Sequence, residues 1–184
     1  LRSIDRADAA LLLLDAEEGP TDQDIRIARL IKDKGVASVI LVNKWDLVEK
    51  DERTAGTFAL RIQDEMKNIS YSPIIFISAK SKQRVHKALE TAIEVFENRK
   101  QRIKTSQLNE ILLEAVEAYP PPSVKGKFIK IKYVTQLPSP TPAFALFANL
   151  PQYIKEPYRR YIENQIRGHF RFTGVPIQVF FRQK

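Results

Sequence analysis

The residues of this sequence best suited to chemistry are Asn43, Lys44 and Asp46, in the run Asn-Lys-Trp-Asp. They follow residues 39–42, whose unbroken apolar character is typical of a buried strand. Guanine presents a ring N–H beside an exocyclic amine, and one carboxylate accepts hydrogen bonds from both, whereas adenine lacks this pair of donors. The pattern therefore predicts a guanine-selective pocket in which Asp46 binds the edge of the base.

The other residues of the run suit the rest of such a pocket. We expect the amide of Asn43 to contact the base and a neighbouring loop. The aliphatic stem of Lys44 is expected to lie across the purine face, with its ammonium in water. Trp45 is predicted to pack over the rim of the pocket, because a large aromatic side chain is best placed against apolar neighbours.

A second polar loop follows the apolar residues 74–77 and consists of Ser78, Ala79 and Lys80. Parallel strands end at the same edge of a sheet, so we expect this loop to form the opposite wall of the same pocket. A backbone N–H near Ala79 would then lie within reach of the guanine carbonyl oxygen. Two such loops together are far more specific than three matched residues alone.

The elements that must position these loops alternate between strands and helices. Strands are predicted over residues 9–16, 38–43 and 74–77. Helices are predicted from a cap at Thr21, with Asp24 in the first turn, to Gly35, and over residues 54–66 and 85–102. The last helix has Leu89, Ala92, Ile93 and Phe96 on its apolar face. This order indicates a parallel sheet with right-handed crossovers.

The pattern changes after about residue 104, which indicates a first domain of residues 1–104 and a second of residues 105–184. The second domain has the predicted order α-β-β-α-β, over residues 105–119, 127–134, 143–149, 156–170 and 175–181, with a short helix expected near 150–154.

Alternation within the first strand of the second domain predicts Ile129, Ile131 and Tyr133 on one face, and Lys130 and Lys132 on the other. In its second helix, four-residue spacing places Tyr158, Ile162, Ile166 and Phe170 on one stripe. We expect these aromatic residues to lie in the core rather than to stack on nucleic-acid bases.

Charge is divided unevenly along the chain. The formal net charge is +8, but residues 1–118 hold 19 Lys/Arg against 20 Asp/Glu, while residues 119–184 hold 11 against 2. This excess favours contact of the second domain with an anionic partner such as RNA. The residues expected to contact RNA or a partner are Lys125, Lys127, Lys130, Lys132, Arg159, Arg160, Arg167 and Arg171.

Composition excludes several classes of protein. The sequence has no Cys and only two His, His86 and His169, so a thiol nucleophile, a disulfide framework and a Cys/His zinc site are ruled out, and no metal site is predicted. No apolar run approaches the roughly 20 residues of a membrane-spanning helix, and no secretory signal opens the chain. We therefore expect a cytoplasmic protein without membrane contacts.

Taken together, Asn-Lys-Trp-Asp and Ser-Ala-Lys resemble the guanine-recognition pair of translation-factor-related small GTPases. Residues 6–28, 39–52 and 160–182 closely resemble the Der (EngA) family, double-Era-like GTPases of bacterial ribosome assembly. The resemblance covers essentially the whole chain, as the back half of the second GTPase domain and the C-terminal KH-like domain. It implies an α/β fold: a partial P-loop-type GTPase domain with a parallel sheet, followed by a small α+β KH-like domain.

The resemblance also implies a function. It gives base-binding roles for GTP or GDP to Asn43, Lys44 and Asp46, with Ser78, Ala79 and Lys80 as the second wall of the pocket. It further implies a GTPase of ribosome biogenesis that acts in assembly of the large ribosomal subunit. The implied partners are the large subunit or its RNA, or an upstream GTPase domain against which the KH-like domain docks.

Several elements of the family pattern are missing. Neither G-x-x-x-x-G-K-[ST] nor D-x-x-G occurs, so we expect no phosphate cradle, magnesium ligand or catalytic residue in this chain. We expect the residues to belong to a longer protein that supplies these groups, and the chain alone to be inactive. RNA-binding KH domains also carry a G-x-x-G loop. Gly168 and Gly174 stand apart here, and the family's KH-like domain lacks that loop as well.

Two alternatives stay open. The first is a non-catalytic RNA-binding or ribosome-binding module supported by a degenerate nucleotide fold. The second is a carboxylate-based hydrolase that uses Asp15 with Glu17 and Glu18. It is the weaker alternative, because acidic residues in a loop before a helix usually complement the helix dipole.

Overall fold

The computed structural model describes residues 3–49, 51–124 and 126–183, so the predicted contact residue Lys125 lies outside the described residues. The chain forms two compact units. Unit 1 comprises Leu1–Arg99 with Phe172–Pro176, and unit 2 comprises Lys100–Arg171 with Ile177–Lys184. The sequence predicted a boundary between residues 104 and 105, whereas in the structure unit 2 begins at Lys100 and the later segment Phe172–Pro176 belongs to unit 1.

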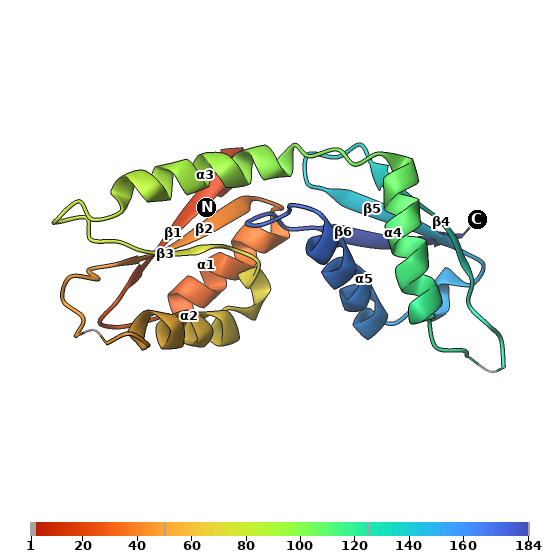
Figure 1. Cartoon of the computed structure of the whole chain (residues 1–184), viewed down its shortest axis with the longest axis horizontal. Helices are drawn as coiled ribbons and strands as arrows, with labels where there is room; N and C mark the ends of the chain where they lie inside the picture. Colours follow the sequence, from red (N-terminus) through yellow and green to blue (C-terminus); the bar gives the residue numbers. More distant parts are fainter. Residues whose placement is uncertain (1–2, 50, 125, 184) are drawn as a thin grey trace. The chain divides into compact units, whose positions relative to one another are not determined.

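Unit 1 is built on a three-stranded parallel sheet (Figure 1). Its strands, in spatial order, are β1 (Ala9–Asp15), β2 (Ala37–Asn43) and β3 (Ile74–Phe76). Its helices are α1 (Asp22–Asp33), α2 (Thr54–Glu65) and α3 (Val85–Arg99), with short 3-10 helices at Ile4–Arg6 and Lys67–Ile69. Helices α1 and α2 lie over one face of the sheet and α3 lies over the other (Figure 1). The predicted parallel α/β architecture is confirmed.

Local sequence explains the central strand and the first helix of unit 1. Residues 37–42 of β2 are all buried, as expected of a strand covered on both faces. Helix α1 begins with a reciprocal cap, in which the Asp24 backbone N–H donates to Thr21 Oγ1 at 3.3 Å and the Thr21 N–H donates to Asp24 Oδ2 at 2.9 Å. The cap predicted at Thr21 is therefore confirmed.

Helix α3 packs against the sheet through a different face from the one predicted. Its buried residues are Ala88, Thr91, Val95 and Asn98. On the predicted face, Leu89 is 53% exposed and Ile93 is 64% exposed. The prediction was wrong because helical spacing marks an apolar stripe but does not say which stripe meets the sheet, and small side chains let a helix approach closely.

A segment distant in sequence packs within unit 1. Phe172 and Val175, in the loop after the last helix of the chain, are 1% and 0% exposed. Within the same loop, the Gly174 carbonyl accepts a hydrogen bond from the Ser38 N–H at 2.7 Å, and the Gly174 N–H donates to the Tyr71 carbonyl at 2.8 Å. The loop is thereby fixed beside the start of β2.

Unit 2 is an α+β structure on a second three-stranded sheet. Its elements are α4 (Thr105–Ala118), β4 (Ile131–Leu137), β5 (Ala143–Ala148), the 3-10 helix Pro151–Tyr153, α5 (Glu156–His169) and β6 (Gln178–Gln183). The strand order is β4-β5-β6, with β4 antiparallel and β6 parallel to β5. The predicted order α-β-β-α-β is confirmed, and so is the buried stripe of α5, Tyr158, Ile162, Ile166 and Phe170.

One strand of unit 2 departs from the predicted alternation. Ile131 is buried as expected, but Tyr133 is 42% exposed and forms a cross-strand pair with Phe147 at 5.9 Å between ring centroids. The reason is an irregularity in the β4–β5 register between Ile131 and Tyr133, which places an extra residue, Lys132, in the strand and shifts the phase of the following side chains.

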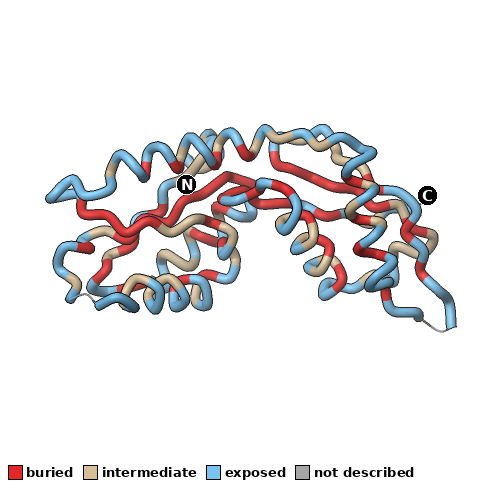
Figure 2. Tube along the Cα trace, in the orientation of Figure 1, coloured by how far each residue is buried: buried red, intermediate tan, exposed pale blue. Residues whose placement is uncertain are grey.

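Buried residues run along β2 and β5, the central strands of the two sheets, whereas each α-helix is buried along one side (Figure 2). Within the described residues, no helix has the length and apolar character needed to cross a membrane.

Candidate functional site

The predicted pocket lies where the parallel strands of unit 1 end. Strand register places Asp15, the last residue of β1, opposite Asn43, the last residue of β2. Val42 of β2 lies opposite Phe76, the last residue of β3. Because all three strands run in one direction, the loops that follow them are neighbours at one edge of the sheet, which is where open α/β sheets bind ligands.

The loops after β2 and β3 line a cavity of about 360 Å³. Its lining residues are Asn43, Lys44, Asp46, Leu47, Ser78, Ala79 and Lys80. All six residues assigned to the pocket from the sequence thus meet around one cavity, whose size falls near the lower end of the roughly 300–1,000 Å³ typical of small-molecule sites. A second hollow of about 390 Å³ lies near the start of α2, from Asp51 to Arg61, and takes no residue from a strand end.

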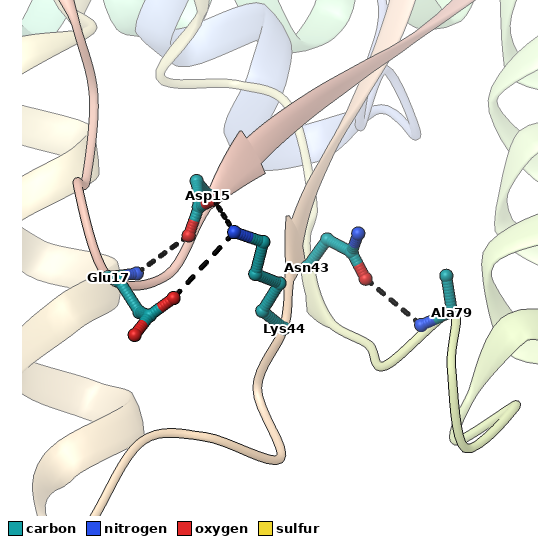
Figure 3. Close-up of polar contacts among 5 residues, drawn as sticks. All are labelled: Asp15, Glu17, Asn43, Lys44 and Ala79. Atoms are coloured by element: carbon teal, nitrogen blue, oxygen red, sulfur yellow. Dashed lines mark hydrogen bonds and ion pairs between the residues drawn. The ribbon is translucent and has the colours of Figure 1, made fainter.

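A side-chain hydrogen bond joins the two walls of the cavity. The Ala79 backbone N–H donates to Asn43 Oδ1 at 3.0 Å (Figure 3). Asn43 therefore contacts the neighbouring loop as predicted. The Ala79 N–H, which was expected to face the guanine carbonyl oxygen, instead donates to Asn43. Ser78 is fully buried, and its Oγ accepts a hydrogen bond from the Ser81 N–H at 3.1 Å, which orders the second wall.

Lys44 has an unusual backbone conformation and two acidic partners. Its φ of 60° lies in the left-handed region of backbone conformation, which residues other than Gly rarely adopt and which recurs at functional sites. Its Nζ lies 2.6 Å from Asp15 Oδ2 and 3.6 Å from Glu17 Oε2 (Figure 3). The hydrogen bond to Asp15 raises the pKa of Lys44, so the ammonium stays charged.

Sequence analysis did not assign to the pocket either Leu47, which lines the cavity, or Asp15, which pairs with Lys44. The bond from Lys44 and a second from the Glu17 backbone N–H lower the pKa of the Asp15 carboxyl. A carboxyl held ionised in this way is a poor general acid. Its position at the end of a strand parallel to the one before Asn43 was the signal that could have identified it.

Trp45 packs inward rather than toward a ligand. It is 5% exposed, and its ring centroid lies 4.2 Å from that of Phe76 and 5.6 Å from that of Phe58. Trp45 packs against apolar side chains as expected, but in the core of unit 1 rather than over the rim of the pocket. The aromatic cluster anchors the loop between Lys44 and Asp46 on that core.

The basic residues predicted to contact RNA or a partner differ in their surroundings. Arg167 pairs with Glu163 at 2.9 Å, and Arg159 donates to the Val179 carbonyl and lies over the Phe181 ring. The exposed members of the set within the described residues are Lys127, Lys130, Lys132, Arg160 and Arg171. Both histidines, His86 and His169, are also exposed.

A search for similar proteins agrees with the two-part architecture. Residues 1–119 match the family of the elongation factor Tu GTP binding domain. Residues 102–182 match the KH-domain-like family of EngA bacterial GTPase enzymes, C-terminal. The two matched regions overlap between residues 102 and 119, which include α4.

The chain is also similar to complete bacterial proteins. GTPase Der of Flavobacterium johnsoniae is 52% identical over 184 residues, which are 100% of this chain and 42% of that protein. GTPase Der of Porphyromonas gingivalis is 48% identical over 185 residues, again 100% of this chain and 42% of that protein. The chain thus spans less than half the length of these relatives. Among solved structures, Era of Aquifex aeolicus aligns with 100% of this chain and 67% of its own, at 16% identity and a TM-score of 0.46.

Proposed function

This chain belongs to the Der (EngA) family of GTPases, and from that premise we propose that its cavity binds the base of GTP or GDP. The observation that carries the proposal is the Asn43–Ala79 hydrogen bond, which joins both strand-end loops around one cavity lined by Asp46. The proposal extends to the whole protein: a cytoplasmic GTPase that acts in assembly of the large ribosomal subunit.

Within this proposal, each pocket residue has a distinct role. The Asp46 carboxylate accepts hydrogen bonds from the ring N–H and the exocyclic amine of guanine. The stem of Lys44 packs on the purine face, and Asn43 holds the two walls at a fixed separation through Ala79. Selectivity arises because adenine would leave the Asp46 carboxylate without these donors.

Hydrolysis requires groups that this chain does not provide. No G-x-x-x-x-G-K-[ST] element occurs in the sequence, and among the described residues no cluster of three or more His, Cys, Asp or Glu could hold a metal ion. We assign to this chain the selection of guanine, and place the phosphate-binding and magnesium-binding groups of the proposed GTPase elsewhere in the protein.

Asp46→Asn in the full-length protein tests the base assignment. The new amide can donate to the extra carbonyl of xanthine but no longer accepts from both guanine donors as a carboxylate does. We expect GDP binding to weaken by about tenfold or more, because hydrogen bonds to a charged group are lost, and XDP binding to strengthen. Calorimetric titration measures both affinities. Glu49→Gln removes an exposed acid from the same loop and is the control. An unchanged preference for GDP over XDP would reject the pocket assignment.

We also propose that unit 2 contacts ribosomal RNA, with a docked GTPase domain of the same protein as the other candidate partner. The exposed side chains of Lys127, Lys130, Lys132, Arg160 and Arg171 support this proposal. Their replacement by Gln in combination should weaken RNA binding and flatten its dependence on salt, since fewer phosphates are neutralised. Unchanged RNA affinity together with loss of nucleotide-dependent domain docking would favour the other partner.

The alternative function is a non-catalytic RNA-binding or ribosome-binding module on a degenerate nucleotide fold. It predicts salt-dependent RNA binding by the full-length protein without measurable affinity for GDP or GTP. The same titration that tests Asp46→Asn therefore separates the two functions, because a nucleotide-binding protein must saturate with GDP before any variant is compared.

A further inference from the structure

The ion pair between Asp15 and Lys44 is not explained by hydrogen bonding to a guanine edge. Asp15 belongs to β1 and is not part of either loop that lines the cavity, yet its Oδ2 lies 2.6 Å from Lys44 Nζ. Glu17 lies on the same side of the ammonium at 3.6 Å (Figure 3). Both acids approach the end of the side chain of Lys44, a residue that lines the cavity.

The Asp15 carboxylate is oriented by its own loop. Its Oδ1 accepts a hydrogen bond from the Glu17 backbone N–H at 2.9 Å, which leaves Oδ2 for Lys44. The Asp15 side chain is 24% exposed, compared with 48% for that of Lys44. The two oxygens thus have separate partners, so the backbone fixes the direction in which the carboxylate presents its second oxygen.

Both ends of the Lys44 side chain are therefore constrained. At its Cα, the left-handed φ of 60° and the buried ring of the next residue, Trp45, fix the direction in which the side chain leaves the backbone just after β2. At its Nζ, Asp15 and Glu17 hold the ammonium. A lysine whose ammonium has no partner would lose rotamer freedom when its stem packs against a ligand, and this entropy loss reduces the affinity for the ligand. A lysine already held in place loses less rotamer freedom on binding.

We propose that Asp15, assisted by Glu17, is a positioning residue that holds the stem of Lys44 in place for the purine face of a guanine nucleotide. The inference rests on the proposed guanine pocket. It assigns Asp15 a different effect from Asp46. Packing on a ring face does not depend on the edge groups that distinguish one purine from another, so Asp15 sets the affinity for the base and Asp46 sets the selectivity.

A double-mutant cycle in the full-length protein tests this role. Titration measures the dissociation constants of GDP and IDP, whose hypoxanthine lacks the exocyclic amine, for wild type, Asp15→Asn, Lys44→Met and the double variant. We expect Asp15→Asn to weaken GDP and IDP binding by the same factor of about two to five, the range of partly exposed ion pairs. In the Lys44→Met background, Asp15→Asn should have no effect, because the methionine has no charge to hold.

Two further variants complete the test. Asp15→Glu keeps the charge and should restore most of the affinity lost in Asp15→Asn. Glu18→Gln removes an exposed acid of the same loop that, unlike Glu17, forms no ion pair with Lys44, and it should leave affinity unchanged.

Different failures have different meanings. An equal loss of affinity on Asp15→Asn in both backgrounds would show that Asp15 supports the fold rather than Lys44, and would overturn the inference. So would unchanged affinity in the wild-type background, or a change in the ratio of GDP to IDP affinity. If the wild-type protein binds neither nucleotide, the proposed function itself fails, and the inference fails with it.

Discussion

Replacement of Gly174 by Ala should destabilise unit 1, although the residue lies far from the rest of that unit in sequence. Gly174 has a φ of +74°, and a Cβ added there would clash with the Val95 side chain, with Val95 Cβ at 2.8 Å and the Ser38 carbonyl oxygen at 3.0 Å. Val95 is 1% exposed and β-branched, so it has little room to move.

The expected loss follows from two terms. The left-handed conformation costs an alanine roughly 1–2 kcal/mol. Overpacking of a buried site costs a further 1–3 kcal/mol or so. The free energy of unfolding should therefore fall by about 2–5 kcal/mol, a large share of the roughly 5–15 kcal/mol of a typical domain. The midpoint of thermal unfolding should fall by about 8 °C or more for a unit of this size.

Urea unfolding followed by tryptophan fluorescence measures this loss. Trp45 is the single tryptophan of the chain and lies in the core of unit 1, so its emission reports on that unit. Gly19→Ala is the matched control, because Gly19 has the same φ of +74° in the same unit but would meet only the end of the Arg61 side chain, at 3.3 Å. The control should lose only the conformational term, about 1–2 kcal/mol.

Gly168→Ala tests a glycine replacement that should not lower the free energy of unfolding. Gly168 lies within α5 with nothing within 4 Å of an added Cβ, so the substitution should be neutral or stabilising by up to about 1 kcal/mol. If Gly174→Ala were no more destabilising than Gly19→Ala, the packing of Phe172–Pro176 within unit 1 would be refuted.

Two further changes test the contacts that fix individual elements. Asn109→Ala should destabilise unit 2 by about 2–3 kcal/mol, because Asn109 Oδ1 accepts from the Val134 N–H at 2.8 Å and its Nδ2 donates to the Val134 carbonyl at 2.7 Å. Hydrogen exchange at the Val134 amide measures this loss, and unchanged protection of that amide would contradict the prediction. Thr21→Ala removes the cap of α1 and should cost about 1 kcal/mol by Trp45 fluorescence, whereas Thr21→Ser should be nearly neutral; equal losses would argue against the capping role.

The sequence by itself determined the order of the main elements and six of the seven residues that line the cavity. Runs such as residues 37–42 are apolar without interruption because their strand is covered on both faces, and this identified the parallel sheet. The loops that begin at Asn43 and Ser78 then had to meet, since parallel strands end at one edge whatever the detailed packing. The capping residues of α1 are likewise local and required no tertiary information.

The tertiary structure decided what depends on register and on contacts between distant segments. Asp15 reaches Lys44 only because β1 and β2 pair with Asp15 opposite Asn43. Tyr133 is exposed because the register of β4 shifts at Lys132, a change of one residue that reverses the faces of a strand. Gly174 belongs to unit 1 through hydrogen bonds to Ser38 and Tyr71, which no periodic pattern encodes, because such contacts are set by the folded path of the chain.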